Sequence, residues 1–284
     1  MTTPAFPYGT DRRPTATYPV VQRTGIRFFR RVARFFSAFF LDVGYRVYFL
    51  RDIARALGDP ATYLPLTIRQ MRNIGVDSLP LAAIVAAFIG SVTALQTRYQ
   101  LFPGIQLSVV GFITRQMIIL ELGPLLTALV LTGRVGARMT AEIGTMRVTE
   151  QIDALETLSF DPVAYLVVPR LLAALIMLPV LTIMANAVGV STAFVTGVVA
   201  TDVTWEQFQE GLRLGFTEFQ VTYSLIKAFL FGGAIAFVCA YEGYIAEAGA
   251  EGVGRSTARA VVVTSVVILL LDALTAAYLA PQLQ

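Results

Sequence analysis

Long apolar segments dominate the chain from about residue 79 to its end. A helix that crosses a bilayer needs about 20 mostly apolar residues. Five segments approach or exceed this length: 79–95 with a short extension at each end, 109–131, 163–200, 221–241 and 258–280. The pattern predicts an all-α integral membrane protein, with a five-span domain over residues 73–284.

The third apolar segment, residues 163–200, is ambiguous. At about 1.5 Å of rise per residue it is far longer than one bilayer crossing, so it could be one tilted or broken span or two short spans. With one span and a cytosolic amino terminus, the cytosolic loops carry Arg134, Arg138, Arg147, Arg255 and Arg259. The opposite side then holds Arg98, Arg213, Asp202, Glu206 and Glu210. Because basic residues collect on the cytosolic side, we predict five spans, with the amino terminus inside and the carboxyl terminus outside.

The segment before the spans has two parts of different character. Residues 1–24 are rich in Pro, Thr and Arg, which predicts a flexible tail. Residues 25–72 are expected to form amphipathic interfacial and connecting helices, broken near residues 58–60. In the stretch 26–43, IRFFRRVARFFSAFFLDV, phenylalanines occupy one side of a helical wheel, and the other side holds Arg27, Arg30, Arg31 and Arg34. Such a helix could lie in the headgroup plane with its arginines on anionic lipid, or it could pack on the rest of the protein.

Composition supports the membrane interpretation. Hydrophobic residues make up 56% of the chain, the mean hydropathy is +0.67, and only 14% of residues are charged. This leaves too little polar surface for a soluble domain of this size. More than half of the 22 basic residues lie between Arg12 and Arg72, a distribution more typical of membrane contact than of nucleic-acid binding.

The chain lacks the residues on which most catalytic and metal sites depend. It has no histidine, and Cys239 is its only cysteine, so there is no internal disulfide or cysteine metal cluster. None of its glycine-rich stretches ends in the Gly-Lys-Ser/Thr of a phosphate-binding loop. We therefore expect no catalytic residues, no metal and no cofactor on this chain.

Three charged residues lie within the predicted spans. Glu121 interrupts MIILELGPLLTALVL, where Pro124 loosens the helix; Lys227 is the only lysine, and Asp272 falls in the last span. Charges at membrane depth are costly and often functional. The three could line a common polar cavity, or they could pair for structural reasons, or Lys227 could extend to the surface.

A polar block, GRVGARMTAEIGTMRVTEQIDALETL, separates the second and third apolar segments at residues 133–158. Within it, residues 149–158 have an amphipathic helical pattern, with Ile152 and Leu155 on one face. Thr149 is a candidate N-cap, with Glu150 in the first turn. The block could be an ordinary loop or a surface for a cytosolic partner, and from the residues alone the loop is favoured.

At this block the sequence resembles a known family. ELGPLLTALVLTGRVGARMTAEIGTMRVTEQIDALETL, residues 121–158, closely resembles the signature of the MlaE/YrbE permeases, the membrane subunits of ABC transporters that work with MCE-domain proteins in bacterial lipid trafficking. The resemblance continues through DPVAYLVVPRLLA (161–173), IKAFLFG (226–232) and GVGRSTARAVV (252–262). It covers about residues 120–280 well, and the amino-terminal third only by its pattern.

The resemblance implies a non-catalytic permease that forms a homodimer in the bacterial inner membrane, with its carboxyl terminus periplasmic. Its implied partners are two copies of a cytosolic ABC ATPase that binds the ATP, a periplasmic MCE-domain protein and, in some systems, a STAS-domain protein. Its implied substrate is phospholipid or a related hydrophobic lipid. Residues 145–158 would contain the coupling helix.

The resemblance also implies roles for individual residues. The coupling role falls on Glu142, Arg147, Glu150 and Asp153. Glu121, Lys227 and Asp272 match polar positions of the lipid cavity. Many members have an arginine where this chain has Leu120, so a lipid phosphate would here depend on Lys227 or Arg115.

Two other functions are compatible with parts of the sequence. A stand-alone secondary transporter or channel would use Glu121, Lys227 and Asp272 as an ion or proton relay. A membrane-embedded lipid enzyme is the other alternative, but the chain offers no recognisable nucleophile–base pair.

Overall fold

The computed structural model describes residue 41, residues 43–58 and 60–279, and residue 282. The chain divides into two compact units, Met1–Phe49 and Leu50–Gln284. In the first unit the described residues are helical. The predicted tail over 1–24 and nearly all of the predicted interfacial helix over 26–43, including its four arginines, lie outside the described residues.

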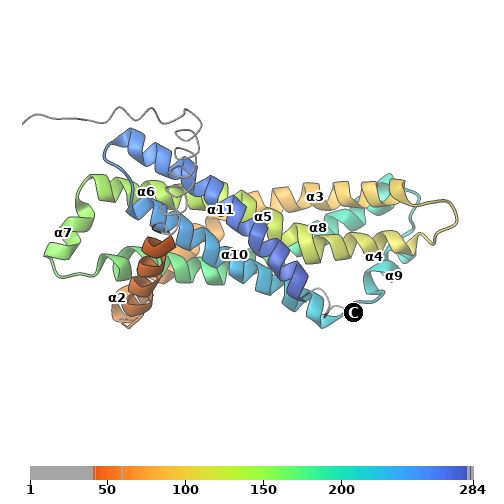
Figure 1. Cartoon of the computed structure of the whole chain (residues 1–284). Helices are drawn as coiled ribbons and strands as arrows, with labels where there is room; N and C mark the ends of the chain where they lie inside the picture. Colours follow the sequence, from red (N-terminus) through yellow and green to blue (C-terminus); the bar gives the residue numbers. More distant parts are fainter. Residues whose placement is uncertain (1–40, 42, 59, 280–281, 283–284) are drawn as a thin grey trace, which may run out of the picture. The chain divides into compact units, whose positions relative to one another are not determined.

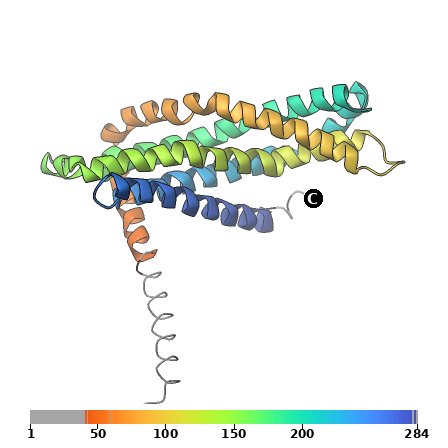
Figure 2. The same ribbon diagram turned by 90° about the horizontal axis from the view of Figure 1, so that it is seen from above.

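The second unit begins in a helix that continues to residue 56, and α2 follows at Pro60–Ile74. The break predicted near residues 58–60 is therefore confirmed. Five long helical stretches are each long and apolar enough to cross a membrane, and the first of them, Tyr63–Gln100, contains a 3₁₀ turn at Val76–Ser78. Figures 1 and 2 show them running side by side. The prediction of an all-α protein with five spans is confirmed at this level.

The second span is the most irregular of the five. It consists of α4 (Ser108–Met117), α5 (Gly123–Leu131) and α6 (Ala137–Val148), joined by π-helical turns at Ile118–Leu122 and Thr132–Gly136. A π-helical turn holds an extra residue in the helix and often marks a functional position. One of these turns contains Glu121.

The other long helices are simpler. They are α3 (Leu79–Gln100), α8 (Val168–Ala200) with a π-helical turn at Val163–Val167 before it, α10 (Glu218–Tyr244) and α11 (Ala250–Leu279). The ambiguous third segment is thus one continuous helical stretch that accommodates Pro179 in its interior. Two short spans at this position are excluded.

Glycines allow the closest helix contacts. A Cβ atom at Gly90 of α3 would collide with the backbone carbonyl of Gly189 on α8, so α3 has no room for a side chain there. Close approach through small residues is the usual way for membrane helices to gain packing contacts. α10 packs against α5, α6, α8 and α11, which makes it the central helix of the bundle.

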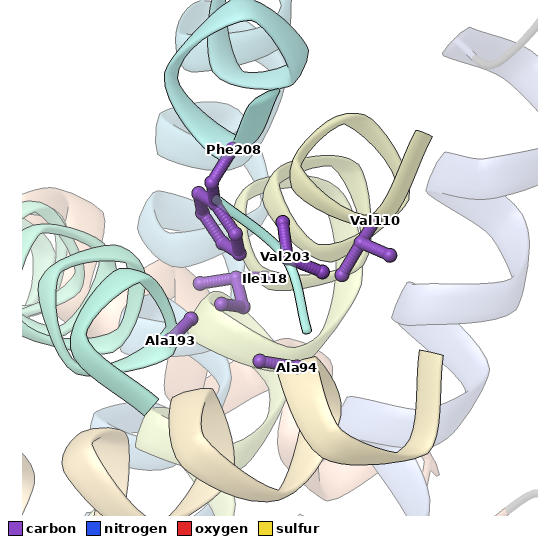
Figure 3. Packing of buried hydrophobic residues seen from close by; sticks show 6 residues of the cluster. All are labelled: Ala94, Val110, Ile118, Ala193, Val203 and Phe208. Atoms are coloured by element: carbon purple, nitrogen blue, oxygen red, sulfur yellow. The ribbon is translucent and has the colours of Figure 1, made fainter. Parts of the chain in front are cut away.

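Helix α9 (Trp205–Arg213) was not predicted from the sequence. Its signal was present, because Thr204 and Gln207 form a capping box in which each side chain binds the other's backbone N–H. Phe208 of α9 is completely buried and packs with Ala94, Val110, Ile118, Ala193 and Val203 (Figure 3). This short helix therefore closes one end of the bundle, opposite α7 (Figure 1).

Helix α7 spans Gln151–Thr157, within the predicted range 149–158. The predicted cap at Thr149 is wrong. α6 continues to Val148, so Thr149 ends that helix, and its hydroxyl donates back to the Thr145 carbonyl at 2.8 Å. Glu150 turns the chain into α7 with a left-handed φ of 59° and makes no side-chain capping bond.

Candidate functional site

The three intramembrane charges meet in one cluster. Lys227 Nζ on α10 lies 2.6 Å from Glu121 Oε2 in the second span and 2.7 Å from Asp272 Oδ1 on α11. Lys227 is completely buried, so its extension to the surface is wrong. We call Glu121, Lys227 and Asp272 the charge triad.

The lysine of the charge triad makes two hydrogen bonds and one further ion-pair contact. Its third neighbour is the backbone carbonyl of Leu120, which accepts a hydrogen bond from Nζ at 3.2 Å. The Asp272 carboxylate pairs with the ammonium by charge and close approach, without a hydrogen bond of good geometry. The Tyr223 ring lies 5.0 Å away and adds a cation–π contact. Lys227 therefore joins α10 to both the second and the fifth span.

The two carboxylates of the charge triad differ in their surroundings. The side chain of Asp272 is 11% exposed, whereas that of Glu121 is 44% exposed. Two carboxylates and one ammonium carry an excess negative charge when all are ionised, which is costly at membrane depth. Because the Glu121 side chain is half-exposed, the cluster opens to the outside of the single chain through Glu121.

A neighbouring polar contact extends the cluster toward α8. Asn186 Nδ2 donates to Ser224 Oγ at 3.1 Å, and Ser224 is completely buried one turn before Lys227 on α10. The Oδ1 atom of Asn186 faces Gly123, where a Cβ would collide with it. The sequence showed Asn186 only as an interruption of an apolar run, because its contact with Ser224 depends on how α8 packs against α10.

Arg115 lies in a different environment. Its guanidinium donates to the carbonyls of Leu212 and Leu214, at 2.8 and 3.1 Å, and lies over the rings of Phe112 and Phe216. These contacts hold the connection between α9 and α10. The structure thus brings together the charge triad but does not bring Arg115 into it.

The four candidate coupling residues fall into two groups. Arg147 Nη1 lies 2.6 Å from Asp153 Oδ1, and its guanidinium lies over the Tyr244 ring on α10. This pair braces the corner between α6 and α7, at which Glu150 is exposed. Glu142 lies two turns before Glu150, on α6, and contacts a different pair of arginines.

Glu142 joins α6 to α8. Its two carboxylate oxygens accept from Arg138 Nε at 2.7 Å and from Arg170 Nη2 at 3.2 Å. Arg170 also donates to the Leu166 carbonyl and is largely buried. Sequence reasoning did not single out Arg170, although an arginine next to a long apolar run was a visible signal.

Helix α7 presents an acidic outer surface. Ile152 is completely buried and Leu155 is half-buried, which confirms their shared inner face. Glu150, Asp153 and Glu156 are exposed. Figure 1 shows α7 projecting at one end of the bundle. The helix is therefore accessible to a partner in the isolated chain.

Comparison with protein families identifies the chain. The family model described as "Permease MlaE" matches residues 67–278, a range that includes α3, the whole second span, α8 and α10 and nearly all of α11. The chain belongs to the MlaE permease family. It is therefore the permease subunit of an ABC transporter and a multi-pass membrane protein, and ATP hydrolysis belongs to a partner ATPase.

Three relatives illustrate the range of MlaE-like proteins. A probable ABC transporter permease of Rickettsia prowazekii (strain Madrid E) is 43% identical over 216 residues, covering 74% of this chain and 82% of that protein. The intermembrane phospholipid transport system permease MlaE of Haemophilus influenzae is 34% identical over 214 residues, or 74% and 81% of the two chains. The chloroplastic protein trigalactosyldiacylglycerol 1 of Arabidopsis thaliana is 31% identical over 207 residues, or 72% and 59%.

Proposed function

We propose that this chain is the permease of an ABC transporter that moves phospholipids or related lipids between the bacterial inner membrane and a periplasmic MCE-domain protein. The observation that carries the proposal is the family match across all five spans, together with a relative named for intermembrane phospholipid transport. Energy would come from ATP bound by the partner ATPase.

The charge triad is the proposed polar element of the lipid cavity. Glu121 is half-exposed on the single chain, so a second copy of the permease facing it would enclose a polar space at membrane depth. Lys227 and Asp272 would set the charge of that space. Because the triad joins three spans, any motion that separates those spans must break one of its ion pairs.

Helix α7 is the proposed coupling helix, within residues 145–158. Its acids Glu150 and Asp153 would face the ATPase, and Arg147 would transmit movement of α7 to α6 and α10 through Asp153 and Tyr244. Glu142 would carry that movement to α8 through Arg170. An exposed acidic helix on a rigid support suits this role, because motion at its tip reaches three spans.

The remaining assignments follow the same proposal. The permease would be a homodimer, with an MCE-domain protein on its periplasmic side and a STAS-domain protein as a possible regulatory partner. The amino terminus would be cytosolic and the carboxyl terminus periplasmic. Residues 1–24 would form the tail, 25–72 the interfacial and connecting helices, and 73–284 the permease domain. Arg27, Arg30, Arg31 and Arg34 would contact anionic lipid.

The proposal is tested by reconstituting the chain with its ATPase and MCE partners in liposomes and measuring transfer of labelled phospholipid. We expect transfer that requires ATP and the ATPase. Gradient-driven transport by the chain alone, without ATP, would instead support the secondary transporter, with the charge triad as its relay. Product formation from labelled lipid by the isolated chain would support the enzyme.

A further inference from the structure

A second charged cluster lies far from the charge triad, at the α7 end of the bundle. Arg134, Arg138, Glu142 and Arg170 line a hollow together with Gln70 and Asn73 of α2. The hollow is small and partly open to the outside. Along the second span, Arg138 follows Glu121 by about 25 Å, from the usual helical rise. The two sites are therefore separate.

The charges of this hollow do not balance. Among the described residues that line it, Glu142 is the single carboxylate, and it is shared between Arg138 and Arg170. Arg134 has no carboxylate within ion-pair distance in the part of the chain that the structure describes. Three guanidinium groups against one carboxylate leave an excess of positive charge. The amides of Gln70 and Asn73 add neutral donors, so the hollow is suited to an anion.

The height of the hollow along the bundle agrees with a particular kind of anion. The second span begins at Ser108, and helical rise places Arg134 and Arg138 about 40–45 Å further along. A bilayer with its headgroups is about 40–45 Å thick. The arginines therefore lie at the level of the headgroups when the opposite end of the span is at the other surface.

Helix α2 has the side chains expected beside a lipid at this level. Leu64 and Ile68 are 57% and 68% exposed on its outer face. Gln70 and Asn73 lie on the opposite face and line the hollow. The helix thus presents apolar groups to acyl chains and polar groups to the arginine cluster.

We propose that the hollow between α2, α6 and α8 binds a phosphate group, supplied by an anionic phospholipid of the adjacent leaflet. Arginine forks match the geometry of phosphate oxygens and bind them through charge-assisted hydrogen bonds. A bound headgroup would tie α2 to α6 and α8, and α6 leads directly into α7. This site needs neither the ATPase nor transport, so its failure would leave the proposed function untouched.

The test uses the purified, delipidated full chain in mild detergent. Short-chain phosphatidylglycerol is titrated and binding is followed by native mass spectrometry and by thermal shift. The test variant is Arg134→Gln, because Arg134 has no ion pair among the described residues and its loss breaks none of them. The matched control is Arg213→Gln, which removes the same charge at the end of α9.

We expect the dissociation constant for phosphatidylglycerol to rise about tenfold or more in Arg134→Gln, from the loss of a charge-assisted hydrogen bond, and to stay unchanged in Arg213→Gln. Equal binding by Arg134→Gln and the wild type overturns the site, as does equal weakening by the control. A parallel titration with inorganic phosphate distinguishes a lipid headgroup from free phosphate as the source of the bound phosphate group. Phosphate binding as tight as lipid binding, and weakened by Arg134→Gln, supports the phosphate site but overturns the lipid as its source.

Discussion

Lys227 donates a hydrogen bond to the backbone carbonyl of Leu120, on a different span, at 3.2 Å. An uninterrupted α-helix would pair that carbonyl with the N–H of residue 124, which is a proline and has none. The lysine supplies the missing donor. The charge triad is therefore attached to a helix interruption to which both Pro124 and the π-helical turn contribute.

Lys227→Met is expected to destabilise the fold. The substitution leaves Asp272 and Glu121 without their cation and the Leu120 carbonyl without its donor. Breaking a buried ion pair by removing one partner costs about 3–5 kcal/mol. The half-exposed Glu121 can recover some hydration, so we expect a loss near about 3 kcal/mol, measured as thermal unfolding in detergent.

The matched control replaces all three members of the charge triad, as Lys227→Met with Glu121→Gln and Asp272→Asn. Without uncompensated charges this variant should recover much of the lost stability, because neutral replacement of a buried ion network is often tolerated. Transport should stay impaired if the charges serve the lipid cavity. Wild-type stability in Lys227→Met alone would show that the pairing contributes little.

Gly90→Ala should weaken the contact between α3 and α8. The added Cβ would overlap the Gly189 carbonyl and the Thr192 hydroxyl, so the helices must separate. Overpacking of this kind costs about 1–3 kcal/mol. Gly254→Ala is the control, because a Cβ there meets nothing in α11, and alanine should be neutral or stabilising by up to about 1 kcal/mol. Similar melting temperatures for the two variants would argue against the close contact.

Charge reversal on α7 should uncouple the ATPase from the spans. Glu150→Lys with Asp153→Lys replaces two exposed acids, and Asp153→Lys also repels Arg147. Because exposed ion pairs contribute at most about 1 kcal/mol, the fold should survive. We expect loss of the co-purifying ATPase or of lipid-stimulated ATP turnover. Normal turnover by a complex that retains its ATPase would refute the coupling role of these acids.

Glu156→Lys is the informative comparison for that experiment. Glu156 is also exposed on α7, but no coupling role is proposed for it. We expect a weaker effect on turnover than from the double variant. An equal effect would mean that the overall charge of α7, and not the ion pair between Asp153 and Arg147, determines ATP turnover by the partner.

The ion pair between Arg98 and Asp202 should show a simple pH dependence. Arg98 Nε lies 2.5 Å from Asp202 Oδ1, and this hydrogen bond holds the pKa of the Asp202 carboxyl below its ordinary value. A lowered pKa means that the pair stabilises the fold above the ordinary range of Asp, near about 4, and that this contribution fades as the pH falls below it. Asp202→Asn should therefore remove a small stability difference that is present at neutral pH and absent in acid, as measured by melting at several pH values.

Several features were predictable because they depend on local sequence alone. Five apolar runs of sufficient length predict five spans wherever the helices pack, since crossing the bilayer requires only length and hydrophobicity. The break before Pro60 follows from proline geometry, and Ile152 and Leu155 share a face through helical periodicity.

Tertiary structure alone decided how the charges are arranged. The spans are apolar nearly all round, so their pattern does not specify which face turns inward or which helix lies beside it. Only packing brings Lys227 between Glu121 and Asp272, pairs Asn186 with Ser224, and directs Arg115 to the carbonyls after α9. The sequence by itself determined that these costly groups lie within the spans, whereas the rotation and contact of the helices determined which partners they have.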